Sequence, residues 1–308
     1  MTRYGVHAGT EGATIQEVVA FWRRVEALGY GWLSIWDHFS PMLGGRVGSL
    51  EAVASHAALA CLTQGPRLGV LVYAIGYRHP AVLANAVSTI DQLSGGRVEV
   101  GVGAGWHEPE HRSYGLAFEP TGKRIDKLDE GVQCLAGLLH QQRFSFQGRY
   151  FHLEEASLGV RPVQERVPLW IGGLGERRIL PMAARHADGW DAPLGPSAEA
   201  FAHKVRVLEQ ACAAVGRDPA SIRRSAHVAV VGDQAELQAK FGSYAYDTRP
   251  GGVLMGPDEE VLEGIRAFEA AGADQVLLAG DIASGSEQLE RVAGLLQLSR
   301  SDPGRPSG

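Results

Sequence analysis

The sequence predicts an α/β fold built as a (β/α)8 barrel, or TIM barrel. Strand-like and helix-like segments alternate eight times along the 308 residues. The strands at 68–72 and 275–280 are continuously apolar, as expected when helices cover both faces of a parallel sheet. The length also suits one such barrel. An open doubly wound sheet is the alternative, but its fingerprint is weak, because the segment 101–106, GVGAGW, lacks the third glycine.

The first half of the chain predicts four strand–helix units. Apolar residues at helical spacing predict the first helix, which Gly29 ends. The strands are expected at 4–7, 32–36, 67–74 and 97–105, and the helices at 14–30, 49–63, 81–94 and 122–140.

The second half predicts four more units and two insertions. Alternating residues at 143–156, with a turn at Gln147-Gly148, indicate a β-hairpin after the fourth helix. An irregular insertion is expected near 241–256. The strands are expected at 167–173, 188–192, 222–232 and 274–280, and the helices at 176–186, 197–216, 258–272 and 286–298. Residues 1–298 are therefore expected to form a single domain, and the polar residues 299–308 a disordered tail.

Composition narrows the class of protein. The chain is 45% hydrophobic and 21% charged, with a net charge of -6, and its basic residues are dispersed. Nucleic acid and membrane surfaces are therefore not expected as partners. The three cysteines have no paired spacing, and neither a signal-peptide core nor a membrane-spanning run is present. These features predict a cytoplasmic protein with reduced thiols.

Residues 105–111, GWHEPEH, contain the order H-E-x-x-H, which on a helix can bind zinc. Pro109 stands between the two histidines, where a helix interior would not tolerate it. A third histidine at the extended spacing is also missing, since that position is Ala117. We therefore predict no metal site, and interpret the stretch as a polar loop at the carboxyl end of a barrel strand, the end where active sites lie.

The predicted strand ends carry few charges and many aromatic and glycine residues. Such a surface suits a flat, hydrophobic ring that the backbone approaches closely. His38 could be a buried structural histidine, but its position at a strand end favours a functional role. Glycines that open a helix leave backbone N–H groups free for a phosphate. The residues are Trp36, Asp37, His38 and Phe39, then Gly103, Ala104, Gly105 and Trp106, then Gly172, Gly173, Leu174 and Gly175.

Three segments resemble one family. They are TIDQLSGGRVEVGVGAGWHEPEHRSYGLAF, FQGRYFHLEEA and PLWIGGLGERRILPMAARHADGW. In this order they resemble the luciferase-like monooxygenase superfamily, most closely its branch of oxidoreductases that depend on the deazaflavin coenzyme F420. The resemblance extends from about Gly5 to Leu298. It implies a (β/α)8 barrel with an insertion, usually a homodimer.

The resemblance implies roles for matching residues. The segment DHFSP places the active-site histidine at His38, with Asp37 beside the cofactor. A non-prolyl cis peptide under the cofactor ring falls at Leu71-Val72. The loop of Gly103, Ala104 and Gly105 would run beside the ring, and the segment 172–175 would hold the cofactor phosphate, with the amides of Gly173 and Leu174 in reach.

The sequence also departs from the family pattern. A carboxylate that follows the strand-four glycines in the sugar-phosphate dehydrogenases is Trp106 here, unless Glu108 or Glu110 replaces it. The residues that bind the substrate phosphate are missing too, because Pro193 and Pro196 occupy those positions. The departures favour an apolar or aromatic metabolite, which would contact Trp36, Phe39, Met42 and Trp106.

The predicted function is reversible hydride transfer between F420 and a small, non-phosphorylated organic substrate, with His38 as general acid or base. The main alternative is an FMN-dependent monooxygenase of the same superfamily, which would take reduced flavin from a reductase partner and activate oxygen. A barrel that carries or senses a cofactor without turnover is a third interpretation. Binding of F420 and FMN, oxygen uptake and turnover distinguish the three.

Overall fold

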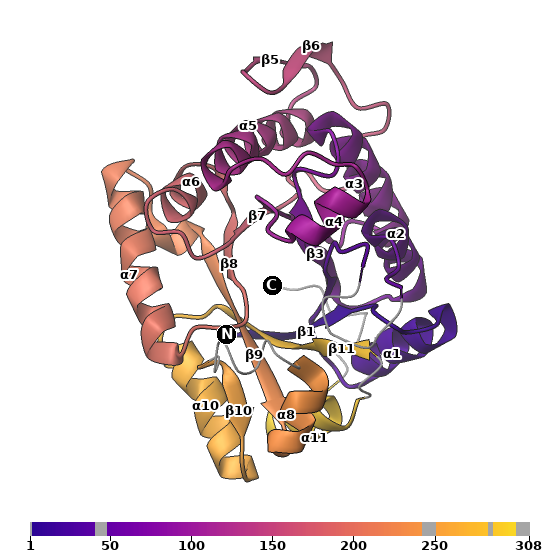
Figure 1. Ribbon diagram of the computed structural model, residues 1–308, viewed down its shortest axis with the longest axis vertical. Coiled ribbons are helices and arrows are strands. Elements are labelled where there is room, and N and C mark those ends of the chain that lie inside the picture. The colour runs from indigo at the N-terminus through magenta and orange to yellow at the C-terminus, as the bar shows by residue number, and fades with distance from the viewer. Residues whose placement is uncertain (1, 41–47, 242–250, 283–285, 300–308) are drawn as a thin grey trace.

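The structure, a computed structural model, describes residues 2–40, 48–241, 251–282 and 286–299. Eight parallel strands form a closed barrel with helices around it, as Figure 1 shows. The predicted (β/α)8 fold is therefore confirmed. Met42 and the tail from residue 300 onward lie outside the described residues.

The barrel strands run in the order β11-β1-β2-β3-β4-β7-β8-β9, and the pairing of β9 with both β8 and β11 closes the ring. Each predicted strand corresponds to one of them. Their bounds are β1 (Arg3–Gly9), β2 (Trp32–Ile35), β3 (Arg67–Ala74), β4 (Val98–Gly103), β7 (Leu169–Gly172), β8 (Gly189–Ala192), β9 (Arg223–Val231) and β11 (Gln275–Asp281).

Each barrel strand is followed by a helix that packs on the outside. In the first helix, Thr14 and Glu17 form a capping box, in which each side chain binds the other's backbone amide. The buried face of that helix matches the apolar stripe of the sequence. The outer helices are α1 (Ile15–Ala27), α2 (Ala52–Leu62), α3 (Pro80–Ser94), α5 (Thr121–His140), α6 (Ile179–His186), α7 (Ala198–Ala214), α10 (Asp258–Ala270) and α11 (Glu287–Leu295).

The two predicted insertions have different outcomes. The hairpin is confirmed as β5 (Phe144–Gln147) and β6 (His152–Ala156), and Figure 1 shows it outside the ring of helices. The irregular insertion is partly wrong. Strand β10 (Val253–Met255) lies within it and pairs with the carboxyl-terminal part of β9, while helix α8 (Gln234–Phe241) precedes it. Residues 242–250 of the expected insertion lie outside the described residues.

Two tryptophans fill the middle of the barrel. The Trp32 and Trp170 rings are fully buried, and their centroids lie 5.8 Å apart. Glycines on neighbouring strands make the space, because a Cβ on Gly5, Gly69 or Gly189 would lie within 2.6 Å of a tryptophan atom. The barrel is therefore packed rather than hollow at this level.

A charged cluster closes the amino-terminal end of the barrel. The Glu99 carboxylate is buried and accepts hydrogen bonds from Arg3 at 3.0 Å, from Arg67 at 2.9 Å and from the Trp170 indole at 2.6 Å. Arg223 adds a third guanidinium group at 3.3 Å. Burial alone would raise the pKa of Glu99, but the three arginines outweigh it and lower the pKa.

Candidate active site

The carboxyl ends of the strands bring His38 and Glu110 together, although 72 positions separate them in the sequence. Nδ1 of His38 lies 2.8 Å from Oε2 of Glu110, and both side chains are buried. The backbone amides of Phe39 and Ser40 donate to Oε1 at 2.7 and 2.8 Å, and the Tyr77 hydroxyl donates to Oε2 at 2.5 Å. The carboxylate is thus surrounded by donors.

This arrangement sets the charge of Glu110 and the nitrogen through which His38 donates to it. Burial alone would raise the pKa of Glu110, but hydrogen bonds from His38, Tyr77 and Ser40 outweigh it and lower the pKa to about 2. An ionised carboxylate only accepts hydrogen bonds, so Nδ1 of His38 is the donating nitrogen. Nε2 of His38 makes no hydrogen bond to any residue in the described part of the chain. Several buried polar atoms of that part lack a partner, and Nε2 is not one of them. His38 can therefore exchange a proton through Nε2.

Glu110 stands on a short helix, α4 (Glu108–Ser113), which Figure 1 shows inside the ring of outer helices. The predicted polar loop is therefore wrong. Pro109 lies in the first turn of α4, where its missing N–H removes no helical hydrogen bond. The helix turns Glu110 inward and leaves Glu108 exposed, in a surface ion pair with Arg112.

Of the two carboxylates considered as replacements at the Trp106 position, only Glu110 reaches His38. Its low pKa keeps it ionised, so it is suited to orient the histidine and not to donate a proton. Gly105, at φ 73°, turns the chain from β4 toward α4. Trp106 follows, 59% exposed, with its ring 5.8 Å from that of His38.

Asp37 links the ends of two strands. Arg78 donates to both of its carboxylate oxygens, at 2.6 and 2.9 Å, and the amide of Ala74 donates at 3.1 Å. Arg78 also binds Glu51. Burial raises the pKa of Asp37, and the contact with Arg78 opposes that rise. The side chain predicted to face the cofactor is thus already bound within the protein.

Strand β3 carries the expected backbone feature, since the Leu71-Val72 peptide is cis. The register between β3 and β4 shifts at this point. The Val72 side chain then projects over neighbouring glycines. A Cβ on Gly101 would lie 2.5 Å from the backbone oxygen of Val70, and one on Gly103 or Gly172 would lie 2.5 or 2.7 Å from a Val72 methyl carbon. We call Val72, Gly103 and Gly172 the glycine half of the barrel mouth, which is the carboxyl end of the barrel.

The segment after β7 differs from its prediction at one residue. The Gly173 amide donates to the Asp191 carbonyl at 3.0 Å, so it is not free for a phosphate. The amides of Leu174, Gly175 and Arg177 make no hydrogen bond within the described residues. A phosphate could therefore bind at this helix start one residue later than expected.

Four buried polar residues that sequence reasoning missed line the other side of the mouth. His7 Nδ1 lies 2.9 Å from the Ser34 hydroxyl, and His227 Nε2 lies 2.9 Å from an Asp191 oxygen. The two histidine rings lie 4.6 Å apart. Burial, together with nearby His227 and His38, lowers the pKa of His7 well below its ordinary value. We call His7, Ser34, Asp191 and His227 the polar half of the barrel mouth.

The predicted aromatic pocket residues are only partly gathered. Trp36 lies beside His7, with ring centroids 5.6 Å apart, and its buried indole nitrogen has no partner among the described residues. Phe39 instead packs between Tyr77 and Tyr114, at 4.7 and 4.9 Å. Trp36 and Trp106 therefore flank the histidines of the mouth, while Phe39 belongs to the packing behind Glu110.

The two histidines of the H-E-x-x-H stretch have different neighbours. Nδ1 of His111 donates to the Ala117 carbonyl at 3.0 Å, whereas the His107 ring lies 5.7 Å from that of His38. In the described parts of the chain, no group of three or more His, Cys, Asp or Glu residues is placed to hold a metal ion.

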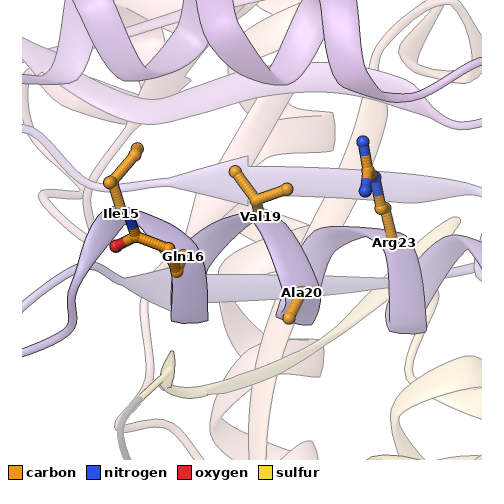
Figure 2. Close-up of a pocket in the computed structure, with 5 residues that line it drawn as sticks. All are labelled: Ile15, Gln16, Val19, Ala20 and Arg23. Atoms are coloured by element: carbon orange, nitrogen blue, oxygen red, sulfur yellow. The ribbon is translucent and has the colours of Figure 1, made fainter.

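A separate pocket lies on the outer surface of α1. Figure 2 shows its lining residues spaced along successive turns of that helix: Ile15, Gln16, Val19, Ala20 and Arg23. It belongs to the helix layer and contains no acid–base pair, so the carboxyl ends of the strands are the better candidate site. Among the described residues, no helix has the length and apolar character that crossing a bilayer requires.

A closed parallel barrel with a buried histidine–carboxylate pair at its carboxyl end has the architecture of an enzyme. The profile of the luciferase-like monooxygenase family matches residues 1–248. The chain therefore belongs to the luciferase-like monooxygenase family.

Curated relatives are similar over part of their length. An uncharacterised protein of Mycobacterium tuberculosis is 31% identical over 170 residues, which cover 55% of this chain and 58% of that protein. The F420-dependent glucose-6-phosphate dehydrogenase of Microbacterium testaceum is 26% identical, covering 66% and 60%. The FMNH(2)-dependent dimethylsulfone monooxygenase of Pseudomonas putida is 29% identical, covering 60% and 50%. The matches thus span less than two thirds of these relatives.

Solved structures share the fold over nearly the whole chain. An F420-dependent secondary alcohol dehydrogenase, in complex with an F420-acetone adduct, has a TM-score of 0.85 at 20% identity and covers 98% of this chain and 99% of that one. The long-chain alkane monooxygenase LadA has a TM-score of 0.78 at 16% identity, covering 98% and 93%. At such identities the likeness establishes the fold alone.

Proposed function

We propose that this protein is an F420-dependent oxidoreductase, which transfers a hydride between the deazaflavin and a small, non-phosphorylated organic substrate. The observation that carries the proposal is the buried His38–Glu110 pair, because it leaves Nε2 of His38 without a hydrogen bond to any described residue, beside the exposed Trp106. Curated relatives named F420-dependent glucose-6-phosphate dehydrogenases support the choice of deazaflavin.

The residues present fit such a cofactor. The glycine half is apolar, and the Val72 side chain lies against Gly103 and Gly172, where a Cβ would collide with it. The free amides from Leu174 onward suit a phosphate at the start of α6. These two surfaces would hold the ring and the phosphate, and the bound deazaflavin would supply the hydride chemistry.

The protein's own contribution is orientation and proton transfer. His38 would exchange the proton that accompanies the hydride through Nε2. Glu110 would keep the imidazole in one tautomer and one orientation, and Tyr77 would hold Glu110 in turn. Trp106 beside the histidine would exclude water from the reacting atoms.

Charge at the barrel mouth favours an uncharged substrate. The Arg78 guanidinium is bound by Asp37 and Glu51, so it is not available to a substrate phosphate. Pro193 and Pro196 follow β8, and neither can donate a hydrogen bond to a phosphate. A hydroxyl or carbonyl compound with an apolar body is the substrate class that these contacts support.

The second candidate is an FMN-dependent monooxygenase that receives reduced flavin from a reductase partner. The Pseudomonas putida relative, named an FMNH(2)-dependent monooxygenase, is the observation that favours it. The glycine half and the amides after β7 serve either ring system, so the two candidates differ in cofactor and in the use of oxygen.

Titration of the cofactor-free protein with F420 and with FMN, each oxidised and reduced, tests the proposal. We expect F420 to bind at least tenfold more tightly than FMN, and we expect no oxygen consumption with the reduced deazaflavin. Tighter binding of reduced FMN, followed by oxygen uptake, would replace the proposal with the second candidate. Binding of neither cofactor would contradict both.

We also propose that the protein is a cytoplasmic homodimer. The outer faces of the neighbouring helices α2 and α3 support a subunit contact, because Ala54 and Cys61 are exposed on one and Val82 and Leu93 on the other. Light scattering on the eluting peak of a sizing column should give twice the chain's mass of 32.9 kDa. A monomer mass at micromolar concentration would contradict it.

A further inference from the structure

The polar half of the barrel mouth has no role in the function proposed above. Its four side chains come from four strands, His7 from β1, Ser34 from β2, Asp191 from β8 and His227 from β9, and all are buried. Burying two imidazoles and a carboxylate is costly unless they are hydrogen-bonded. A packing role alone would be served as well by apolar residues.

Register places the polar half beside the proposed cofactor surface. Asp191 pairs with Gly172 across β7 and β8, and its carbonyl accepts from the Gly173 amide. His7 pairs with Ser34 across β1 and β2. His7, Ser34 and Asp191 therefore lie one layer above the two central tryptophans, with Asp191 next to Gly172, and His227 joins this group through its contacts with Asp191 and His7.

The Asp191–His227 contact resembles the Glu110–His38 contact in chemistry but is reversed in geometry. Glu110 binds Nδ1 of its histidine, whereas Asp191 binds Nε2 of His227, at 2.9 Å. A carboxylate accepts, so His227 carries its proton on Nε2 and leaves Nδ1 as the basic nitrogen. Nδ1 of His227 makes no hydrogen bond to another described residue, and it is not one of their buried polar atoms that lack a partner.

Hydride transfer needs two proton positions. When an alcohol is oxidised to a carbonyl compound, its C–H hydrogen leaves with two electrons and its O–H hydrogen leaves as a proton. A hydride acceptor that becomes a neutral, reduced ring takes up one proton as well. Because these two protons lie on different molecules, two acid–base groups serve the reaction better than one.

We propose that His227, held by Asp191, is the second acid–base group of this active site. This inference rests on the proposed function. His38, beside Trp106, exchanges the proton of the substrate oxygen, and Nδ1 of His227, whose partner Asp191 adjoins Gly172, exchanges the proton on the cofactor side. Asp191 is a positioning residue. His227 also faces His7, whose pKa burial keeps low, so that ring stays neutral and does not repel a proton on His227.

The test is the tautomer of each histidine, measured by nitrogen NMR on protein labelled with ¹⁵N-histidine at pH 8. We expect the Nε2–H form for His227 and the opposite Nδ1–H form for His38, with signals assigned through His227→Gln and His38→Gln. In Asp191→Ala, His227 should lose its preference for the Nε2–H form while the tautomer of His38 stays the same. In Glu110→Ala, His38 should lose its preference for the Nδ1–H form while the tautomer of His227 stays the same. An Nδ1–H form for His227 in the unaltered protein would overturn the pair.

Addition of F420 separates a functional pair from a structural one. We expect the Nδ1 signal of His227 to shift on binding, while His140, on an outer helix, does not move. If F420 binds by fluorescence titration but the His227 signals stay in place, the second acid–base role is wrong and the proposed function stands. If neither F420 nor FMN binds, the proposed function fails and this role fails with it.

Discussion

Replacing Glu110 with glutamine removes a negative charge that five donors share. The five are the His38 ring, the Tyr77 hydroxyl, the amides of Phe39 and Ser40, and the Ser40 hydroxyl. A glutamine has one acceptor oxygen and one NH₂ group, so in either orientation its NH₂ faces donors. The variant is therefore nearly isosteric but badly paired.

The pKa of Glu110 gives the magnitude. Lowering it from the ordinary 4.5 to about 2 corresponds to about 3 kcal/mol of folded-state stability. Because the folded-state pKa lies below the unfolded one, this contribution is complete above about pH 5 and declines as the pH falls from 4.5 toward 2. By pH 3.5, about two fifths of it is lost.

Denaturant unfolding at pH 7 and pH 3.5, followed by tryptophan fluorescence, measures the contribution of Glu110 to the free energy of unfolding. We expect Glu110→Gln to lower the free energy of unfolding by about 3 kcal/mol at pH 7 and by about 2 kcal/mol at pH 3.5. Glu108→Gln is the matched control, because it makes the same change in the same short helix at an exposed ion pair. Its effect should stay below about 1 kcal/mol. Equal effects of the two variants, or a Glu110→Gln deficit that does not shrink in acid, would refute the reasoning.

Three further changes test other parts of the site and fold. His38→Ala should reduce turnover by roughly 10²–10⁴ while cofactor affinity in titration changes only a few-fold, and His107→Ala should do much less; the opposite ranking would place the site on α4. Gly103→Ala puts a Cβ 2.5 Å from a methyl carbon of β3 and should weaken F420 binding at least tenfold, whereas Gly122→Ala, in open space, should bind normally. Glu99→Gln leaves three arginines without their carboxylate and should cost about 3–5 kcal/mol in thermal or denaturant unfolding; an unchanged midpoint would contradict its structural role.

The barrel could be predicted because its strands differ clearly from its helices in sequence. The strand at Arg67–Ala74 carries no charged residue after Arg67 and ends as predicted. Strand β10 was missed because three residues carry no measurable alternation, and α8 because its apolar residues do not concentrate on one face. Helix α4 was missed because Pro109 argues against a helix interior, although it is compatible with a first turn.

The site could be predicted only where chain position decides it. His38 follows a strand, and that position alone places it at the carboxyl end of the barrel. Its pairing with Glu110 is a tertiary contact, which no local spacing encodes. For His227 a signal existed, since it is a polar residue between the apolar residues Ala226 and Val228 of β9, at a position that faces the barrel interior. Inward-facing polar residues of strands deserve the same scrutiny as strand ends.

The packed interior of the barrel has a kinetic consequence. Trp32 and Trp170 fill the middle, and the arginines around Glu99 close the far end, so no route runs through the barrel that the described strands form. Every ligand must enter and leave by one opening. If the cofactor lies deeper, against β3, β4 and β7, it must bind before the substrate. It can then leave only after the product of that substrate has left. Initial-rate measurements should then follow a compulsory order, with the two forms of the cofactor competing for the free enzyme and the smaller product giving mixed inhibition against its own substrate.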